Sequence, residues 1–303
     1  MTEPHVEHLR EHGYAIVRGF FGADEIAGVK RETDKVMAEG LTHHASYRDR
    51  NLMFEILNDP GARRRVLLQA HWFAWINPAL EALRRHPRYL QIMEPLLGRD
   101  IKQVTNQLHW KPPNAKFTGY RFHQDLRFRE RPEVYSNLDR TYLNTGLAID
   151  PHGPENGGLA VYDRSHTRGY LGLADDGPIM KGETQEAELM RAGLVLADRV
   201  DLRLAPGDLV IWTLLTVHGS LPNRSGRDRC FMINSYVRAA DSPARGEWVF
   251  RDGRSTPMGP EPEICKYEQL RERPGPFYIE DDWTGEALTA AEVSRTNEGQ
   301  ADA

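Results

Sequence analysis

The stretch GYRFHQDLRFRE, residues 119–130, places an imidazole and a carboxylate two positions apart in an aromatic run typical of a strand. In an extended strand, side chains at i and i+2 lie on one face with Cα atoms ~6.6 Å apart. That separation allows His123 and Asp125 to converge on one metal ion, if a third ligand comes from elsewhere in the chain. Only 2 cysteines are present and they lie far apart, which argues against a thiolate zinc site.

Among the 12 histidines, His218 is the best candidate for the third ligand. It ends an apolar strand that follows the turn APGD, and a second turn then leads into a returning strand that begins at Arg229. Polar residues at such strand ends commonly line the mouth of a barrel. Two histidines and one carboxylate form the facial triad of non-haem Fe(II) oxygenases, which leaves coordination positions open. The alternative is that all three side chains are satisfied by hydrogen bonds within strands and turns.

The charge balance of such a site gives Arg229 a role. Fe(II) with one aspartate keeps a net positive charge, so a dianionic co-substrate can chelate it, and Arg229 can bind the distal carboxylate through a bidentate fork. HxD alone is a weak signal, but HxD followed by a histidine and by an arginine 11 residues later is much more specific. The alternative for Arg229 is a surface ion pair with Asp208 or Asp228.

The elements that would position these residues change in character along the chain. The first hundred residues predict mostly helices, whereas short strands divided by Gly, Pro and Asn clusters follow from IKQVTNQLHWKPP onward. This order favours a mainly β fold, a sandwich or barrel with flanking helices. We expect one domain over 1–285, with a helical part at about 1–100, a core at about 100–240, a lid or C-terminal extension at about 241–285, and a flexible tail at 286–303.

Bulk properties exclude several classes of protein. The net charge of −5 and the pI near 6.2 give no general attraction to nucleic acid or to an anionic membrane. The N-terminus MTEPHVEHLREHG has no apolar secretory segment, and no run approaches the length of a membrane span. We therefore expect a cytoplasmic protein with a small-molecule substrate and no nucleic-acid or membrane partner. The oligomeric state stays open.

Four motifs resemble the phytanoyl-CoA dioxygenase family of Fe(II)- and 2-oxoglutarate-dependent oxygenases: FHQD, PENGGLAVYDRSH, PGDLVIW and VHGSLPNRSGRDR. The opening EHGYAIVRGFFGADEI is also similar, so the resemblance spans roughly residues 8–240. One departure is DRSH in place of the usual PGSH. Asp125 is present, whereas halogenating relatives replace this carboxylate with a small residue, so hydroxylation is favoured over halogenation.

The resemblance implies a double-stranded β-helix (jelly-roll, cupin-like) core and an enzyme that uses Fe(II), 2-oxoglutarate and O₂. It implies that iron is bound by His123, Asp125 and His218. It also implies a salt bridge from Arg229 to the C5 carboxylate of 2-oxoglutarate, with the rest of that pocket formed by Ser220, Gln107 and Thr145. The expected reaction is hydroxylation of an unactivated C–H bond in a small metabolite, with release of succinate and CO₂.

The sequence says less about the substrate. In an extended strand Arg127 and Arg129 would follow the face of His123, and Arg121 and Arg131 add positive charge that suits an anionic substrate. A solvated strand end is the alternative. Phe122 is expected in the core or in the pocket wall. Two other functions stay open: a cupin-type metalloenzyme that does not use 2-oxoglutarate, and a catalytically silent ligand-binding barrel.

Overall fold

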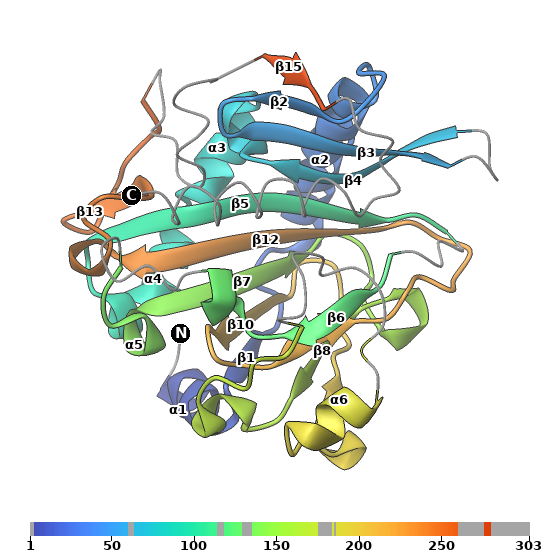
Figure 1. Ribbon diagram of the computed structural model, residues 1–303. Helices are drawn as coiled ribbons and strands as arrows, with labels where there is room; N and C mark the ends of the chain where they lie inside the picture. Colours follow the sequence, from blue (N-terminus) through green and yellow to red (C-terminus); the bar gives the residue numbers. More distant parts are fainter. Residues whose placement is uncertain are drawn as a thin grey trace, which may run out of the picture.

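Two antiparallel β-sheets dominate the fold (Figure 1). The structure, a computed structural model, describes residues 3–59, 64–113, 118–128, 135–174, 184, 186–259 and 276–279. The helices are α1 Glu3–His12, α2 Ala23–Gly40, α3 Pro78–Arg84, α4 Pro87–Leu97, α5 Leu138–Thr141 and α6 Glu186–Arg191. The first strands are β1 Tyr14–Val17, β2 Tyr47–Asp49, β3 Leu52–Asp59, β4 Arg64–His71, β5 Ile101–Lys111, β6 Tyr120–His123, β7 Tyr142–Ala148 and β8 Leu159–Tyr162. The others are β9 Arg199–Asp201, β10 Leu209–Thr213, β11 His218–Ser220, β12 Arg229–Arg238, β13 Glu247–Arg251, β14 Arg254–Ser255 and β15 Phe277–Tyr278.

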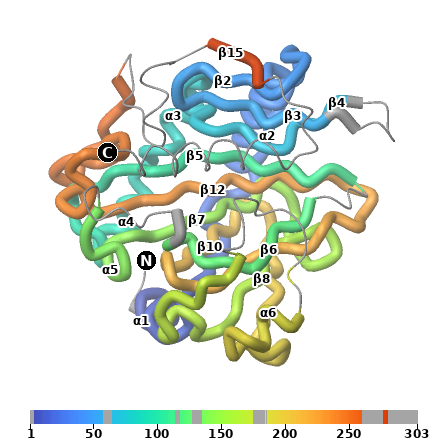
Figure 2. The backbone as a smooth tube through the Cα atoms, viewed as in Figure 1, coloured from blue at the N-terminus to red at the C-terminus, as the bar shows by residue number. Residues whose placement is uncertain are grey.

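The major sheet has the strand order β1-β10-β7-β12-β5-β4-β3-β2-β15, and the hairpin β13–β14 also pairs with β5. Its two longest strands, β5 and β12, come from distant parts of the sequence and run side by side through the middle of the molecule (Figure 2). The minor sheet has the order β6-β11-β8-β9. A cluster of buried residues from both sheets, with Val161 of the minor sheet and Phe231 of the major one among its members, joins them face to face. The jelly-roll core expected from the sequence is therefore confirmed.

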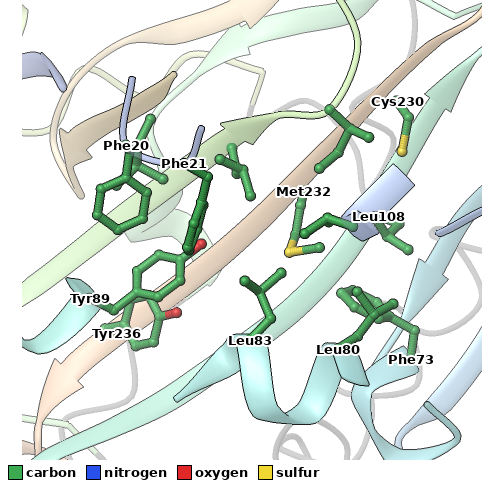
Figure 3. Close-up of a cluster of buried hydrophobic side chains, with 14 of the residues drawn as sticks. Phe20, Phe21, Phe73, Leu80, Leu83, Tyr89, Leu108, Cys230, Met232 and Tyr236 are labelled. Atoms are coloured by element: carbon green, nitrogen blue, oxygen red, sulfur yellow. The ribbon is translucent and has the colours of Figure 1, made fainter. Parts of the chain in front are cut away.

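Helices α2, α3 and α4 cover the other face of the major sheet and bury a second, larger cluster. In α2 the buried residues Ile26, Val29 and Val36 recur at the helical period, so a single face of the helix packs on the sheet. Figure 3 shows Leu80 and Leu83 of α3 opposite Met232 and Leu108 of the central strands. This apolar layer fixes the face of the sheet that points away from the candidate site.

The prediction that residues 1–100 are mostly helical is wrong for residues 47–71, which form β2, β3 and β4. These strands continue the major sheet beyond β5. Short apolar runs such as LMFEIL fit a buried strand or a buried helix equally well, and pairing with β5 decides between them here.

Two described parts of the C-terminal segment at 241–285 pair with strands of the major sheet. Glu247–Arg251 pairs with β5, and Phe277–Tyr278 pairs with β2 at the far edge. The rest of the segment, and the predicted tail at 286–303, lie outside the described residues, so the lid stays a prediction. No helix in the described part of the chain is both long and apolar enough to cross a membrane. The cytoplasmic location stays a prediction.

Candidate metal and co-substrate site

Two strands of the minor sheet and one short turn bring His123, Asp125 and His218 together. His123 ends β6 and is the register partner of His218, which begins β11. Nε2 of His123 lies 3.5 Å from Oδ1 of Asp125, and Nε2 of His218 lies 3.5 Å from Oδ2. One donor atom from each of the three residues fits within 4.8 Å of the others, as a shared metal ion requires.

Asp125 reaches this position through a turn and not through the pleat of a strand. The strand ends at His123, and Asp125–Phe128 forms a 3₁₀ helix, so the prediction of one extended strand through both ligands is wrong. Gln124, fully buried between them, fixes the turn: its amide donates to the carbonyls of Gly169 and Leu215, both at 2.7 Å, and accepts from the Leu171 backbone at 2.6 Å.

The hydrogen bonds of both imidazoles prepare them as metal ligands. Nδ1 of His123 lies 2.7 Å from the Arg121 carbonyl, and Nδ1 of His218 lies 2.9 Å from the Thr216 carbonyl. A carbonyl only accepts, so Nδ1 carries the proton in each ring and the Nε2 lone pair faces the site. Burial, reinforced by the neighbouring His123, lowers the pKa of His218 to about 4. His218 is therefore neutral near neutral pH, as a ligand must be.

Asp125 is also oriented by a buried side chain of the major sheet. Nδ2 of Asn144 in β7 donates to Oδ2 of Asp125 at 2.8 Å. Oδ1 of Asn144 accepts from Ser235 at 2.7 Å, and the Ser235 hydroxyl lies 2.7 Å from that of Thr105. The sequence reading missed Asn144, since no local spacing links β7 to the HxD motif.

A second feature of the site is a pair of buried cations on β5 and β12. Lys111 and Arg229 are direct register partners and are 1% and 3% exposed. Nζ of Lys111 donates to the Ser220 hydroxyl and to the Leu221 carbonyl, both at 2.7 Å. Nη2 of Arg229 donates to the Gly157 carbonyl at 2.5 Å. Ser220 lies two residues after His218, so the pair adjoins the candidate metal site.

No acidic group among the described residues lies within ion-pair distance of these two cations. Among the residues that the structure describes, neither Lys111 nor Arg229 forms an ion pair, and the Arg229 Nε is buried without a hydrogen bond. Burial and the Arg229 charge hold the pKa of Lys111 well below its usual range, and burial lowers the pKa of Arg229 to about 10. Two desolvated cations side by side are costly, so the arrangement fits a site for an anion. Lys111 was missed at the sequence level because only the register of β5 with β12 places it beside Arg229.

The glycine-rich motif after β7 makes room for this pair. Gly157 has φ of +71°, and a Cβ there would lie 2.9 Å from Cδ of Lys111 and 2.5 Å from the Leu221 carbonyl oxygen. A side chain at 157 would therefore displace the lysine. The DRSH departure leaves the loop intact: Arg164 takes the left-handed conformation, φ +57°, and its side chain pairs with Glu11.

Thr145 lies on the wrong face of its sheet for the predicted co-substrate role, whereas Phe122 lies where it was expected, in a buried cluster and in the wall of a pocket. Thr145 follows Asn144 and points to the opposite face, where its hydroxyl donates to the Asn234 carbonyl at 3.1 Å. Phe122 precedes His123 and packs against Tyr162, with ring centroids 5.1 Å apart, on the outer side of the minor sheet. Side chains alternate along a strand, so one position decides which face a residue occupies. The co-substrate role of Thr145 is therefore not retained, and the contact of Phe122 with a substrate stays a prediction.

The strand that was expected to carry Arg127 toward the substrate cavity ends at His123. The 3₁₀ helix Asp125–Phe128 breaks the alternation on which the placement of Arg127 rested. Arg129 and Arg131 lie outside the described residues. Arg121 forms an ion pair with Glu188 at 3.0 Å.

Gln107 lies in a row of polar side chains along the inner wall. Its Nε2 is 3.2 Å from Nδ1 of His71, and its Oε1 is 3.2 Å from Nε2 of His109. The row continues from His71 to Gln69 at 2.8 Å and from Gln69 to the Tyr120 hydroxyl at 2.6 Å. The inner wall beside the site is therefore polar.

A hollow opens on this wall. It is lined by Arg48, Asn51, His71, Trp72, Val104, Thr105, Asn106 and Gln107. Thr105 lines the hollow and also begins the hydrogen-bond chain to Asp125, so the hollow lies on the triad side of the major sheet. Arg48, 3% exposed, brings a positive charge to it.

Comparison with known proteins places the chain in a family. The profile described as phytanoyl-CoA dioxygenase matches residues 9–231. The chain belongs to the phytanoyl-CoA dioxygenase family. The resemblance predicted from the motifs is confirmed, and with it the dioxygenase class of this family member and its dependence on iron and 2-oxoglutarate.

Curated relatives of this family member include enzymes that act on phosphorus compounds. A probable α-ketoglutarate-dependent hypophosphite dioxygenase of Stutzerimonas stutzeri is 24% identical over 263 residues, 82% of this chain and 87% of the relative. A methylphosphonate hydroxylase of Gimesia maris is 26% identical over 160 residues, 53% of this chain and 54% of the relative. A 2-aminoethylphosphonate dioxygenase from an uncultured bacterium is 24% identical over 204 residues, 66% of this chain and 69% of the relative.

Solved structures share the fold at low sequence identity. The iron-bound EctD of S. alaskensis matches with a TM-score of 0.63 and 18% identity, over 88% of this chain and 86% of EctD. The non-haem α-ketoglutarate-dependent carbocyclase SnoK matches with a TM-score of 0.60 and 18% identity, over 86% of this chain and 94% of SnoK.

Proposed function

We propose that this protein hydroxylates an unactivated C–H bond of a small anionic metabolite and couples the reaction to oxidative decarboxylation of 2-oxoglutarate. One O₂ supplies one oxygen atom to the hydroxylated product and one to succinate, and CO₂ is released. The observation that carries the proposal is the His123–Asp125–His218 cluster beside the buried Lys111–Arg229 pair.

The residues of the triad fit an iron ion. Both histidines have Nδ1 bonded to a carbonyl and Nε2 directed at the cluster, and Asp125 adds one negative charge. We assign His123, Asp125 and His218 as the iron ligands. Three ligands from the protein leave positions for the co-substrate and for O₂. When bound, iron and 2-oxoglutarate supply the oxidising power, while the chain positions and shields the reacting groups.

The cation pair fits the distal carboxylate of 2-oxoglutarate. Arg229 would bind it as a bidentate partner, as the sequence predicted, and Lys111 would add a second charged donor. The Ser220 hydroxyl already accepts from Lys111, so it can donate its own proton to the same carboxylate. An ion pair formed here would balance charges that the described residues leave unbalanced.

The polar wall supports a small, anionic substrate with a phosphonate-like head group. Relatives that are named for hypophosphite, methylphosphonate and 2-aminoethylphosphonate act on small compounds of this kind. A small hollow on the inner wall combines the Arg48 charge with hydrogen-bonding groups of Asn51 and His71, and the chain Thr105–Ser235–Asn144 links it to Asp125. Such a combination suits an oxyanion.

Two other functions make different predictions for the cation pair. A metalloenzyme on a similar barrel that does not use 2-oxoglutarate needs no carboxylate clamp, so the Lys111–Arg229 pair argues against it. A catalytically silent binding barrel does not require two histidines whose Nε2 lone pairs both face Asp125.

Succinate formation with a substrate panel tests the proposal. Protein loaded anaerobically with Fe(II) would receive 2-oxoglutarate, O₂ and one of methylphosphonate, 2-aminoethylphosphonate or a small carboxylate. We expect one or more of the phosphorus compounds to raise succinate formation, and ¹⁸O₂ to label a hydroxylated product. Iron binding without any consumption of 2-oxoglutarate would favour the other metalloenzyme, and absence of iron binding would favour the silent barrel.

A further inference from the structure

Asn144 connects the candidate metal ligand Asp125 to the interior of the major sheet. It is 1% exposed, and its Nδ2 donates to Oδ2 of Asp125 at 2.8 Å. Behind it, Ser235 is 3% and Thr105 6% exposed, and both links of the chain measure 2.7 Å. Three strands, β5, β12 and β7, therefore contribute to the orientation of one carboxylate.

The protons of this chain can be arranged in one way. A carboxylate only accepts, so Nδ2 of Asn144 must face Asp125 and Oδ1 must face Ser235. The Ser235 hydroxyl must then donate to Oδ1, which leaves it to accept from Thr105. The Thr105 hydroxyl thus sets the rotation of the Ser235 hydroxyl, which in turn holds the amide of Asn144. Buried networks in which every member is satisfied are rigid.

We propose that Asn144 is a positioning residue that makes Asp125 a one-oxygen ligand. The inference rests on the proposed function, since it needs a metal ion at the triad. A hydrogen bond to Oδ2 uses electron density that this oxygen would otherwise offer to a metal and fixes the carboxylate plane. Oδ1 then serves as the ligand.

The number of oxygens that Asp125 donates matters for the reaction. A six-coordinate ion with three protein ligands keeps three positions, two for a chelating 2-oxoglutarate and one for O₂. If Asp125 coordinated through both oxygens, it would occupy the position that O₂ requires. Asn144 therefore keeps a coordination position open and does not contact the reacting atoms itself.

Metal titration of the apo-protein tests this role without depending on turnover. Asn144→Leu removes the hydrogen bond at similar size, and we expect Co(II) to bind about 10- to 100-fold more weakly, as for other partners of metal ligands. The Co(II) absorption spectrum should also change, because a freed carboxylate can coordinate through both oxygens. The anaerobic charge-transfer band of the Fe(II)–2-oxoglutarate complex should weaken or shift for the same reason.

The far end of the chain offers a matched pair of variants. Thr105→Val removes the hydroxyl and keeps the shape, and we expect a loss of about 2- to 10-fold in Co(II) affinity, the effect of one neutral hydrogen bond. Thr105→Ser keeps the hydroxyl and should bind Co(II) as the unmodified protein does. Thr145→Val is a control on the adjacent position of β7, whose side chain points to the other face of the sheet. It should leave the affinity and both spectra unchanged.

Separate outcomes overturn the inference and the proposed function. If Asn144→Leu folds, binds Co(II) with the original affinity and keeps both spectra, Asn144 does not position Asp125, and the triad stands. If Asn144→Leu does not fold, the Thr105 pair decides, and equal affinity in Thr105→Val and Thr105→Ser overturns the inference. If Asp125→Ala binds Co(II) as tightly as the unmodified protein, there is no metal ion at the triad, and both proposals fail together.

Discussion

The two halves of the candidate site are built in different ways. The triad is assembled from short elements: β6, the turn that follows it and the first residue of β11. Its imidazoles are held by carbonyls two residues away in their own segments. The Lys111–Arg229 pair instead comes from facing positions on the two longest strands of the major sheet. Hydrogen bonds within short segments thus orient the metal ligands, whereas the pairing of β5 with β12 places the two cations side by side.

The charges of the two halves are also opposite in sign. The triad carries the Asp125 carboxylate beside the neutral His218, while the Lys111–Arg229 pair is positive and forms no ion pair with an acidic group among the described residues. Each half is therefore incomplete without a ligand of the other sign, a metal cation at one and a carboxylate at the other. Variants that remove charge from one half of the site should leave the affinity of the other half for its ligand largely unchanged.

The largest expected effect is in the triad. Asp125→Ala removes the only negatively charged protein ligand, so turnover should be abolished while the fold is kept. Asp125→Glu should also be impaired, because the longer side chain displaces the metal. Succinate formation and circular dichroism measure the two quantities. Consumption of 2-oxoglutarate by Asp125→Ala at the original rate would show that the triad is not the metal site.

The next largest effect concerns Arg229. Removing one partner of a desolvated charge pair costs ~2–5 kcal/mol, so Arg229→Ala should raise the KM for 2-oxoglutarate about 30- to 4,000-fold. Arg229→Lys should recover part of this loss, since an ammonium lacks the planar fork. Iron affinity should change little in either variant. An unchanged KM in Arg229→Ala would contradict the assignment and favour the other metalloenzyme.

Removal of Lys111 should have a smaller effect than removal of Arg229. A hydrogen bond to a charged group contributes ~1.5–3 kcal/mol, so Lys111→Met should raise the KM for 2-oxoglutarate about 10- to 100-fold. Loss of repulsion between the two cations offsets part of the cost. The measurement is titration of 2-oxoglutarate at saturating iron. If Lys111→Met behaved like the unmodified enzyme, Lys111 would have no part in the co-substrate site.

The lowered pKa of Lys111 predicts a pH dependence of co-substrate binding. Burial and Arg229 favour neutral Lys111 in the free protein, whereas a bound carboxylate favours the charged form. Binding then takes up a proton once the pH exceeds the free-protein pKa, and affinity falls with rising pH by at most about tenfold per unit. Calorimetry in buffers of different ionisation enthalpy measures this uptake. Lys111→Met should lose it, and an equal uptake in that variant would assign the proton to another group.

The smallest effect is on stability and reports on His152, which adjoins the pair. Burial, with the Arg229 and Lys111 charges, holds the pKa of His152 well below 6.5, and its Nε2 accepts from the Leu159 backbone at 2.8 Å. The unfolded chain therefore binds a proton that the folded apo-protein does not. The free energy of unfolding therefore loses nothing to His152 above pH 6.5. It decreases as the pH falls below 6.5, by at most about 1.4 kcal/mol per pH unit.

Denaturant unfolding at pH 7.5 and 5.5 measures this loss. His152→Gln keeps an acceptor for the Leu159 backbone without titrating, so its stability should fall less over the same interval. An identical fall in both proteins would assign the acid sensitivity to other groups.

The sequence by itself determined the family, the jelly-roll core and the three candidate metal ligands. Each depended on local patterns: HxD at a strand end, a histidine that begins a strand after an apolar run, and strand-length segments divided by turn residues. The arginine of the returning strand was recognised in the same way, because a fixed spacing links Arg229 to His218. Each of these patterns is confined to one short stretch of the sequence, so it is visible before the pairing of the strands is known.

The tertiary structure decided what depends on sheet pairing. Lys111 is found beside Arg229 only through the register of β5 with β12, and Asn144 reaches Asp125 only because β7 lies next to β12 and faces the minor sheet. Thr145 was predicted one position away from the residue that contacts the ligand. Since neighbouring side chains on a strand point to opposite faces, a reading without the register cannot choose between them. Contacts between strands far apart in sequence are set by how the whole sheet packs, and that information is not present in any single segment.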